Sequence, residues 1–393
     1  MAAYSLELVE SRRSRAGFYA APRRIYAGDE AWVCPLDLEL EGLCRPGPGL
    51  AAARRWLLRD AQGRPAGRIA AFVRRRPAEP GQLRAGAAGL FECVDDPAAA
   101  RLLFGAAKDW LQRQGMEAMD APIHAGENDR HWGLLVEGFV QPGFGMPYHK
   151  PYYRALFEDF GFQPLYRQLS RELDLAQLPE RFLRIGEWVR RKPGLTFHHA
   201  DPKHPEIYAR ALQSVYNAAW KTHSQFSPMT DAQVEGLLRG FRHLMIPALL
   251  PYACADGEPA AVLAAVPDLN PVFKPMQGRF PWHEQLRFLW RKRADFAWYR
   301  RRGLLTRARV VMMGVDPRFQ RYGLESGMIA ASASEVLRLG IRRIELGWVG
   351  DFNPPMQRIL EATGAPLRQV HQTWRLVFDG SAAEPPARIP LRA

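Results

Sequence analysis

The stretch from Val310 to Gly364 constrains the fold more than any other part of this chain. An apolar run, V-V-M-M-G-V (310–315), leads into the polar turn D-P-R-F-Q-R-Y-G-L (316–324), and a helical pattern, a second apolar run and the loop G-D-F-N-P-P-M (350–356) follow. Short continuous apolar runs of this kind are typical of buried strands. The order strand, turn, helix, strand, loop and helix predicts a mixed α/β domain.

The polar turn places a glycine, Gly323, where the chain enters the predicted helix. Glycine adopts a positive φ without strain, and the first N–H groups of a helix have no partner within the helix. These groups can point at an anion, and a helix N-terminus of this kind can bind a pyrophosphate. An ordinary strand, turn and helix without a ligand is the alternative interpretation.

The residues Gln320, Arg321 and Gly323 resemble the Q/R-x-x-G-x-G/A acyl-CoA loop of the GNAT acyltransferase superfamily, and Asn353 and Met356 resemble the start of its second signature helix. The family's last Gly or Ala is Glu325 here, and a carboxylate repels a pyrophosphate unless it turns outward or pairs with Arg318 or Arg321. The resemblance implies an acyl-CoA co-substrate held by Val315, Gln320, Arg321, Tyr322, Gly323, Leu324 and Asn353.

A repeat links the two halves of the chain. Gly115 and Asn128 lie thirteen residues apart, as do Gly340 and Asn353, and each pair is followed by an apolar helix pattern, a glycine and a strand pattern. The first half carries E-C-V-D-D-P (92–97) in place of the glycine turn, and its acidic residues disfavour a pyrophosphate. Chance similarity between two α/β segments is the alternative.

The repeat predicts two tandem GNAT-like domains with mixed, mostly antiparallel sheets flanked by helices. We expect a degenerate domain at 1–175, a linker at 176–194, an acyl-CoA-binding domain at 195–378 and a disordered tail at 379–393. A length of 393 residues also favours two domains, since one hydrophobic core rarely serves so long a chain.

Composition limits the possible partners and location. The four cysteines form no C-x-x-C pair, so neither a zinc site nor a disulfide framework is predicted, and no metal is expected. The N-terminus lacks the apolar core of a signal peptide, and no apolar run reaches about 18 residues. We therefore expect a cytoplasmic protein, with peripheral contact to the inner face of the membrane. A net charge of +13 favours an anionic partner: CoA, acidic lipid or nucleic acid.

The segment 270–307 is an insertion between two predicted strands. It contains ten Lys and Arg residues among many aromatic ones, and Trp282, Leu286, Leu289 and Trp290 fall at helical spacing. A basic amphipathic helix with Trp is typical of a membrane interface. The same composition would suit stacking on nucleic acid bases. A hairpin that buries its aromatic side chains against the domain is the third interpretation.

The resemblance also implies where acyl transfer would occur. In the family, strands four and five splay apart and expose a backbone N–H to the thioester carbonyl, and Ala260–Val266 and Arg309–Val315 are the candidates for those strands. The family's general acid is a tyrosine, and the matching position is Leu360. Candidate bases are Asp268, Glu345 and His371, each of which has an equally plain structural interpretation as a turn cap, an ion pair or a strand residue.

The acceptor is the least constrained part of the prediction. The polar and aromatic stretch 216–230 offers Tyr216, Trp220 and His223 for an acceptor pocket, although it could equally be a packed loop. The resulting hypothesis is an acyl-CoA-dependent N-acyltransferase acting on a primary amine, with a sphingoid-like lipid amine at the membrane surface as its sharpest form. An aminoacyl-tRNA-dependent transferase and a non-catalytic CoA- or lipid-binding module are the alternatives.

Overall fold

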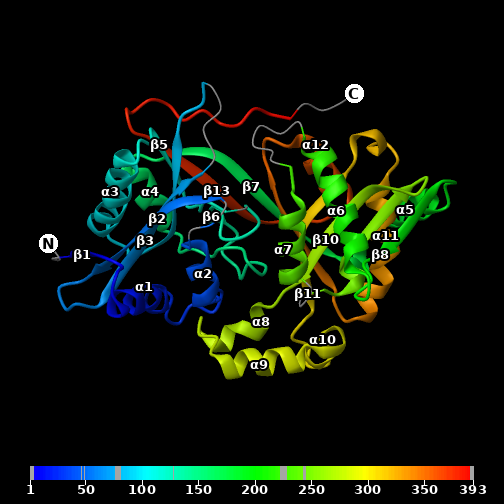
Figure 1. Ribbon diagram of the computed structural model, residues 1–393, viewed down its shortest axis with the longest axis horizontal. Helices are drawn as coiled ribbons and strands as arrows, with labels where there is room; N and C mark the ends of the chain where they lie inside the picture. The colour runs from blue at the N-terminus through cyan, green and yellow to red at the C-terminus, as the bar shows by residue number, and fades with distance from the viewer. Residues whose placement is uncertain are drawn as a thin grey trace.

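The structure, a computed structural model, describes residues 4–45, 47, 49–75, 81–126, 128–221, 228–241 and 245–389. One continuous sheet runs through both lobes of the molecule, and helices flank it in each lobe (Figure 1). Its strands follow the order β1-β2-β3-β4-β5-β13-β7-β12-β11-β10-β9-β8, and β6 pairs with β13 beside this path. The described strand pairs are antiparallel except for β4 with β5 and β11 with β12.

The first half contributes eleven main elements in the order strand, two helices, three strands, helix, two strands, helix, strand. They are β1 (Ser5–Leu8), α1 (Arg12–Ile25), α2 (Asp37–Leu43), β2 (Leu50–Arg59), β3 (Pro65–Arg74), β4 (Ala85–Cys93), α3 (Pro97–Arg113), β5 (Ala118–Ala121), β6 (Leu134–Glu137), α4 (Tyr153–Phe160) and β7 (Gln163–Asp174). A short 3-10 turn, η1 (Leu175–Gln177), follows β7.

In its described residues the second half repeats this order without a counterpart of β6 and with an added helical insertion. Its elements are α5 (Glu180–Arg190), β8 (Leu195–His199), α6 (Pro205–Ala219), α7 (Asp231–Phe241), η2 (Pro247–Leu249), β9 (Pro251–Ala255), β10 (Glu258–Pro267), α8 (Asn270–Phe273), η3 (Lys274–Met276), α9 (Trp282–Arg291), α10 (Arg293–Arg300), β11 (Arg307–Val315), η4 (Pro317–Phe319), α11 (Leu324–Arg338), β12 (Arg343–Gly350), α12 (Pro354–Ala362) and β13 (Leu367–Val377). The mixed α/β tandem fold predicted from the sequence is confirmed.

The two halves share a defect as well as an element order. In the first half the ladder between β3 and β4 slips where Leu90 adopts a positive φ of 51°. In the second half the ladder between β10 and β11 slips beside Ala264 and Ala265, which leaves one extra residue on β11. A bulge of this kind bends its strand and ends regular pairing, often next to a functional site. Both bulges lie on the strand that precedes the long helix of its half.

The last strand of each half completes the sheet of the other half. β7 pairs with β12, and β13 pairs with β5, so the two C-terminal strands are exchanged and also pair with each other at the centre of the sheet. In Figure 1 they cross between the lobes. Because each half borrows a strand from the other, the boundaries 1–175 and 195–378 stay a prediction about folding units.

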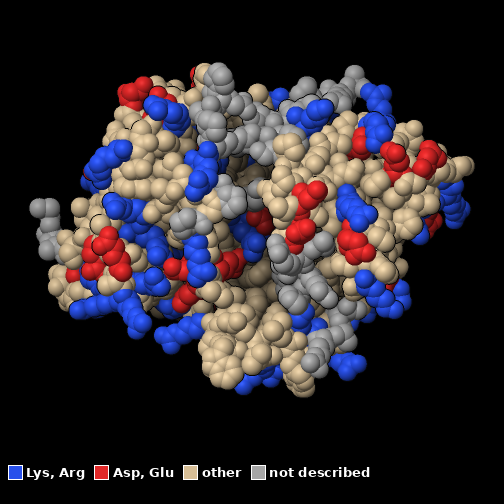
Figure 2. Space-filling view, in the orientation of Figure 1, with Lys and Arg blue, Asp and Glu red and all other residues tan. Residues whose placement is uncertain are grey.

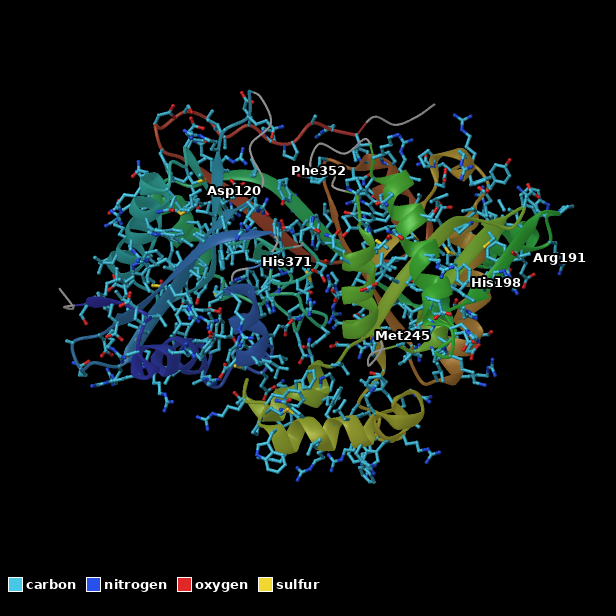
Figure 3. All side chains as sticks on the ribbon, viewed as in Figure 1. Asp120, Arg191, His198, Met245, Phe352 and His371 are labelled. Carbon is cyan, nitrogen blue, oxygen red and sulfur yellow. The ribbon has the colours of Figure 1, made fainter. Side chains whose placement is uncertain are left out.

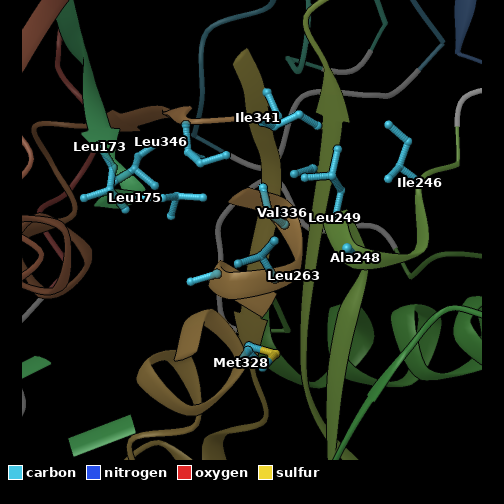
Figure 4. Close-up of a cluster of buried hydrophobic side chains, with 14 of the residues drawn as sticks. Leu173, Leu175, Ile246, Ala248, Leu249, Leu263, Met328, Val336, Ile341 and Leu346 are labelled. Carbon is cyan, nitrogen blue, oxygen red and sulfur yellow. The ribbon is translucent and has the colours of Figure 1, made fainter. Parts of the chain in front are cut away.

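The exchange is visible in the hydrophobic cores. Leu173, which belongs to the first-half strand β7, packs in the second-half core with Leu346 of β12 and with Met328 and Val336 of α11 (Figure 4). In the same way Trp374 of β13 packs in the first-half core. Each fully buried leucine of this kind contributes about 2 kcal/mol to folding. The hydrophobic effect therefore holds the exchanged strands in place.

The predicted linker and the predicted tail both contact the second half. The linker 176–194 contains α5, which packs so closely on α11 that a Cβ on Gly186 would lie 2.5 Å from the carbonyl oxygen of Ser326. The tail has no helix or strand between 380 and 389, but it follows the surface, where the backbone N–H of Ile389 donates to the Phe352 carbonyl at 2.8 Å.

Candidate active site

The parallel strands β11 and β12 separate part of the way along their length. Their ladder pairs Arg307 with Arg343 and continues as far as Val310 and Leu346, whereas β11 runs on to Val315 and β12 to Gly350. A Cβ built on Gly347, the next residue of β12, would lie 2.0 Å from the carbonyl oxygen of Val310, so only glycine fits where the strands part. Beyond this point the two strands form an opening in the sheet.

This opening corrects one sequence-based assignment. The strands proposed to splay were 260–266 and 309–315, but these lie in β10 and β11, which are paired antiparallel along their length. The strands that separate are β11 and β12, and the helix α11 lies between them in the sequence. The error arose because β10 and β12 are both apolar runs. The sequence does not show which of them pairs in parallel with β11.

The turn that follows β11 forms the N-terminus of α11 as predicted. Gly323 is the residue before the helix and has a φ of +73°, a left-handed conformation that favours glycine. A Cβ there would lie 3.1 Å from Val189 of α5, so the turn also packs against the linker helix. Gln320, Arg321 and Tyr322 are exposed beside it, while Leu324 is fully buried and anchors the helix.

The charges around the turn are arranged differently from what the sequence suggested. Arg318 pairs with Asp316 at 3.0 Å and with Glu258 at 3.6 Å, and not with Glu325. Glu325 lies half-buried in the first turn of α11, where burial raises the pKa of its carboxyl group. A raised pKa lowers the mean negative charge near the helix N-terminus, which lessens its repulsion of an anion.

Two of the predicted cofactor residues, Asn353 and Val315, have structural roles. The Asn353 side chain accepts a hydrogen bond from the Met356 backbone N–H at 3.2 Å and so caps α12. Val315 is buried at the end of β11. Leu360, which stands where the family has a tyrosine, is buried in the second-half core.

One side of the opening, along β11, carries an aromatic pair from the stretch that was proposed for the acceptor pocket. Trp220 lies against β11 so closely that a Cβ on Gly314 would be 2.5 Å from its indole ring. Tyr216 stacks on Trp220 with the ring centres 5.1 Å apart. The structure therefore brings these two predicted residues to the strand that forms the opening. His223 lies outside the described residues.

The opposite side of the opening carries aromatic residues that sequence reasoning missed. Tyr166 of β7 stacks on Trp348 of β12 at 6.3 Å and contacts Phe352 edge-on at 5.3 Å. Trp348 donates from Nε1 to the Asn128 carbonyl at 3.0 Å. The run G-W-V-G-D-F contained a signal, since a tryptophan and a phenylalanine flank the end of an apolar strand, but Tyr166 could only be added from the strand exchange.

Beneath this region lies a buried network of charges at the seam between the halves. Glu345 is fully buried and forms a close ion pair with Arg307, and its other oxygen is 3.9 Å from Nε of Arg309. Glu172 of β7 lies 3.5 Å from Nε of Arg307 and 3.0 Å from Arg368 of β13. Arg307 was counted with the basic insertion, but it belongs to β11 and faces this network.

A segment of the first half covers the network. The carbonyl oxygens of Gln141 and Phe144 accept hydrogen bonds from Arg307 and Arg309 at 3.2 and 2.9 Å. A Cβ on Gly143 would lie 2.6 Å from the Glu345 carboxylate, so backbone closes directly over it. This covering segment, residues 137–151, thus seals the centre of the sheet.

Asp268 and His371 are also sealed. Asp268 lies 3.6 Å from Nε of Arg307 and accepts from the Asn270 N–H at 3.0 Å, and burial raises its pKa to about 6. His371 is fully buried on β13, near the middle of the molecule in Figure 3, with Nε2 2.8 Å from the Pro147 carbonyl oxygen. Burial lowers the pKa of His371 to about 4. Asp268 and Glu345 share Arg307, but all three candidate bases are buried at the seam.

The first half contains a cavity at the matching place. It opens partly to solvent and is lined by Leu90 to Glu92 of β4 and by Pro122 just after β5. The covering segment 142–149 and Phe273 of α8 close it. The helix that follows β4 is capped by Asp96, whose carboxylate accepts from the Ala98 N–H at 2.8 Å. An acidic cap occupies the place where the second half has Gly323.

The surface between the lobes is hollowed on the face that carries α1, α2, α6 and α7 (Figure 2). Charged side chains of both signs gather in this hollow. Within the described ranges no group of three or more His, Cys, Asp and Glu side chains is placed to hold a metal ion. None of the described helices is both long enough and apolar enough to cross a bilayer.

Comparison with known proteins places this geometry among acyltransferase folds. No family model matches the chain. The bacterial ceramide synthase of Caulobacter vibrioides is 29% identical over 363 residues, which cover 88% of this chain and 90% of that protein. Protein YghO of Escherichia coli is 28% identical over 362 residues and covers 88% of this chain and 89% of its own length.

Two solved structures superpose on nearly the whole chain. A tandem GNAT protein from the clavulanic acid biosynthesis pathway matches with a TM-score of 0.57 and 13% identity, covering 97% of this chain and 100% of that one. A GCN5-related N-acetyltransferase from Sphaerobacter thermophilus matches with a TM-score of 0.53 and 13% identity, covering 95% of each chain. At such identities the likeness shows the fold alone. The chain has the tandem GNAT fold.

Proposed function

We propose that this protein is an acyl-CoA-dependent N-acyltransferase that transfers a long acyl chain to the primary amine of a lipid-like acceptor. The observation that carries the proposal is the opening between β11 and β12, which leads directly to a helix N-terminus preceded by Gly323. The relative named as a bacterial ceramide synthase, 29% identical over most of both chains, supports a long-chain amine as acceptor.

The proposed donor follows the shape of the opening. The pyrophosphate of CoA would lie against the backbone N–H groups at the N-terminus of α11, with Arg321 beside it. The pantetheine arm would extend along the free edge of β11 from Val315 towards the bulge, where a backbone N–H would face the thioester carbonyl. Asn353 would act through α12, whose first turn it caps at the far end of β12.

The proposed reaction is a direct transfer. The neutral amine nitrogen attacks the thioester carbonyl carbon, the carbon–sulfur bond breaks, and the amide forms while CoA leaves as its thiol with the proton that the amine has lost. Tyr216 and Trp220 on one wall, with Trp348 and Phe352 on the other, would line the path of the acceptor. Long-chain amines partition into membranes, so we place the reaction at a membrane surface.

The base remains a proposal among Asp268, Glu345 and His371. Because Glu345 and His371 are fully buried and Asp268 is 3% exposed, each would need a relay of water or a movement of segment 137–151 to reach an amine. Asp268 is the best placed by acidity, since a pKa of about 6 leaves it largely ionised at neutral pH and able to accept a proton. We propose a structural role for Glu345, because its carboxylate is bound by Arg307 and lies beside Arg309.

The direct experiment mixes the purified protein with palmitoyl-CoA and a long-chain base and follows thiol release and amide formation together. Equal amounts of both products, with little thiol release when the amine is omitted, would support the proposal. Thiol release without an amide would indicate a hydrolase. Absence of CoA binding, together with tRNA binding that weakens with salt, would favour the aminoacyl-tRNA-dependent alternative. CoA binding without turnover over a broad amine panel would indicate a binding module.

A further inference from the structure

The helix α9 carries a row of large apolar side chains that face solvent. Trp282, Leu286, Leu289 and Trp290 are 72%, 57%, 41% and 62% exposed, and their spacing puts them on one stripe of the helix. Single exposed apolar residues are ordinary on a protein surface, but a contiguous group marks an interaction site. Among the three interpretations of this segment, burial of these four against the domain is therefore excluded.

The remainder of the insertion fixes α9 firmly in place. Phe288, on the other side of the helix, is buried against Phe273, Phe296 and Tyr299 with ring centres 5.5 to 6.1 Å apart. The helix lies at the lower edge of the molecule, below both lobes (Figure 1). The exposed stripe is thus presented outward on a rigid support.

The edge around the stripe is positively charged. Arg279, Arg287, Arg301 and Arg302 are exposed in the same insertion, and Glu284, the acidic residue of α9, is bound by Arg287 at 2.6 Å. The guanidinium carbons of Arg302 and Arg291 lie 3.8 and 4.1 Å from the centre of the Trp298 ring. In Figure 2 the surface over α8 and α9 is largely uncharged, with Lys and Arg along its lower rim.

We propose that α9 is a membrane-docking helix that inserts Trp282, Leu286 and Trp290 into the interface of an anionic lipid surface. An apolar stripe with tryptophan, bordered by arginine, is the pattern of helices that lie in the plane of a bilayer. Each arginine near an anionic surface adds about 1 kcal/mol of attraction. The choice of lipid over other partners rests in part on the proposed function, because a long-chain substrate would be drawn from the same surface.

A second copy of the chain fits this face less well. A helix of ten residues is about 15 Å long, and four side chains on it offer far less than the roughly 800 Å² per partner of a stable dimer. The arginine rim would also face its own copy across a symmetric contact, which like charges disfavour. Phe273 contacts Phe288 of α9 and also lines the first-half cavity. Docking of α9 on lipid would therefore place this side of the cavity near the membrane.

Vesicle sedimentation tests the proposal with the full chain. Wild-type protein should bind vesicles that contain one third phosphatidylglycerol and bind phosphatidylcholine vesicles much more weakly. The variant with Trp282→Ala and Trp290→Ala should bind the anionic vesicles at least about tenfold more weakly. The matched control is Trp188→Ala, which removes a tryptophan that is 63% exposed on α5 and should leave vesicle binding unchanged.

Two outcomes would overturn the proposal. If the double variant binds anionic vesicles as well as wild type, α9 does not dock on lipid. If wild type does not bind vesicles but forms dimers that the double variant abolishes, the face is an interface between copies. Vesicle binding requires no turnover, so it can hold even if acyl transfer fails. Conversely, the double variant should keep its activity on substrates dispersed in detergent if only docking is lost.

Discussion

The N-termini of α3 and α11 occupy matching positions in the two halves and carry opposite chemistry. α3 begins after Asp96, whose carboxylate caps the helix and also accepts a hydrogen bond from the Tyr4 hydroxyl at 2.8 Å. α11 begins after Gly323, which has no side chain to offer as a cap. The first half thus satisfies its helix internally, whereas the second leaves backbone donors for a ligand. Under the proposed function, the second half would bind the cofactor and the first half would support it.

The exchanged strands make the sheet of the second half depend on the first half. Without β7 the second-half sheet would lose the neighbour of β12, and without the segment 137–151 the charges of Arg307, Arg309 and Glu345 would have no cover. The first half therefore supports the second from below the opening. This difference between the halves can be tested by substitutions at the seam or at the two helix N-termini, and by lowering the pH.

The largest effect is expected at the seam. Glu345→Gln removes the nearest carboxylate of the buried Arg307 and also a carboxylate beside the buried Arg309, while Glu172 and Asp268 stay next to Arg307. Because the charge of the buried network is then poorly balanced, we expect a loss of about 3 kcal/mol in the free energy of unfolding. Urea denaturation measures it. Glu361→Gln is the matched control, because its pair with Arg171 at 2.9 Å is exposed and should contribute about 1 kcal/mol or less.

This variant also separates the two roles of Glu345. If Glu345→Gln keeps its stability but loses acyl transfer, Glu345 acts in proton transfer and our structural assignment is wrong. If stability and activity fall together, and activity recovers in conditions that restore folding, the residue supports the site through Arg307 alone.

Acid should weaken the seam next. The pKa of His371 is lowered to about 4 by burial, and an unfolded histidine titrates near 6.5. Between these values the unfolded chain binds more protons than the folded one, so stability falls as pH falls from about 6.5 to about 4, by about 1.4 kcal/mol per pH unit for this residue. At pH 5 the loss should be about 2 kcal/mol.

Urea denaturation of wild type and His371→Gln at pH 7 and pH 5 checks this effect. Glutamine can still donate to the Pro147 carbonyl but does not titrate, so the variant should lose about 2 kcal/mol less than wild type on acidification. Equal losses in both proteins would show that His371 is not held neutral at the seam.

Much of the fold could be predicted because its signals are local. The apolar run at 310–315, the helix pattern after it, and the equal spacing of Gly115 with Asn128 and Gly340 with Asn353 all depend on neighbours in the chain.

What could not be predicted depends on distant partners. β7 and β13 have similar patterns, so the sequence does not state which half each strand completes. Arg307 and Glu345 are charged residues of the kind normally exposed, and only their contact across β11 and β12 shows why they are buried. The opening of the site lies between strands separated by α11, so its location required the pairing of the sheet.

The two helix N-termini can be made alike by giving the second half the acid of the first. Gly323→Asp places a carboxylate beside the proposed pyrophosphate, and we expect CoA affinity to fall about 100-fold through repulsion. Gly323→Asn is the control, because asparagine has nearly the same shape and shares the strain of the positive φ of 73° but carries no charge. Isothermal titration of both variants separates charge from strain. Equal CoA affinities in the two variants would show that the pyrophosphate does not bind at this turn.

The reverse change should have the smallest effect. Asp96→Ala removes the cap of α3 and the contact with Tyr4, which should cost about 1 kcal/mol of unfolding free energy. It should not create a second CoA site, because the strand before α3 ends in Glu92 and Cys93, and the exposed N–H groups would still meet Asp95. Calorimetry should therefore find one CoA bound per chain in wild type and variant alike. Two bound per chain would mean that Asp96 alone closed the first half, and that the halves differ by one residue rather than by their whole surroundings.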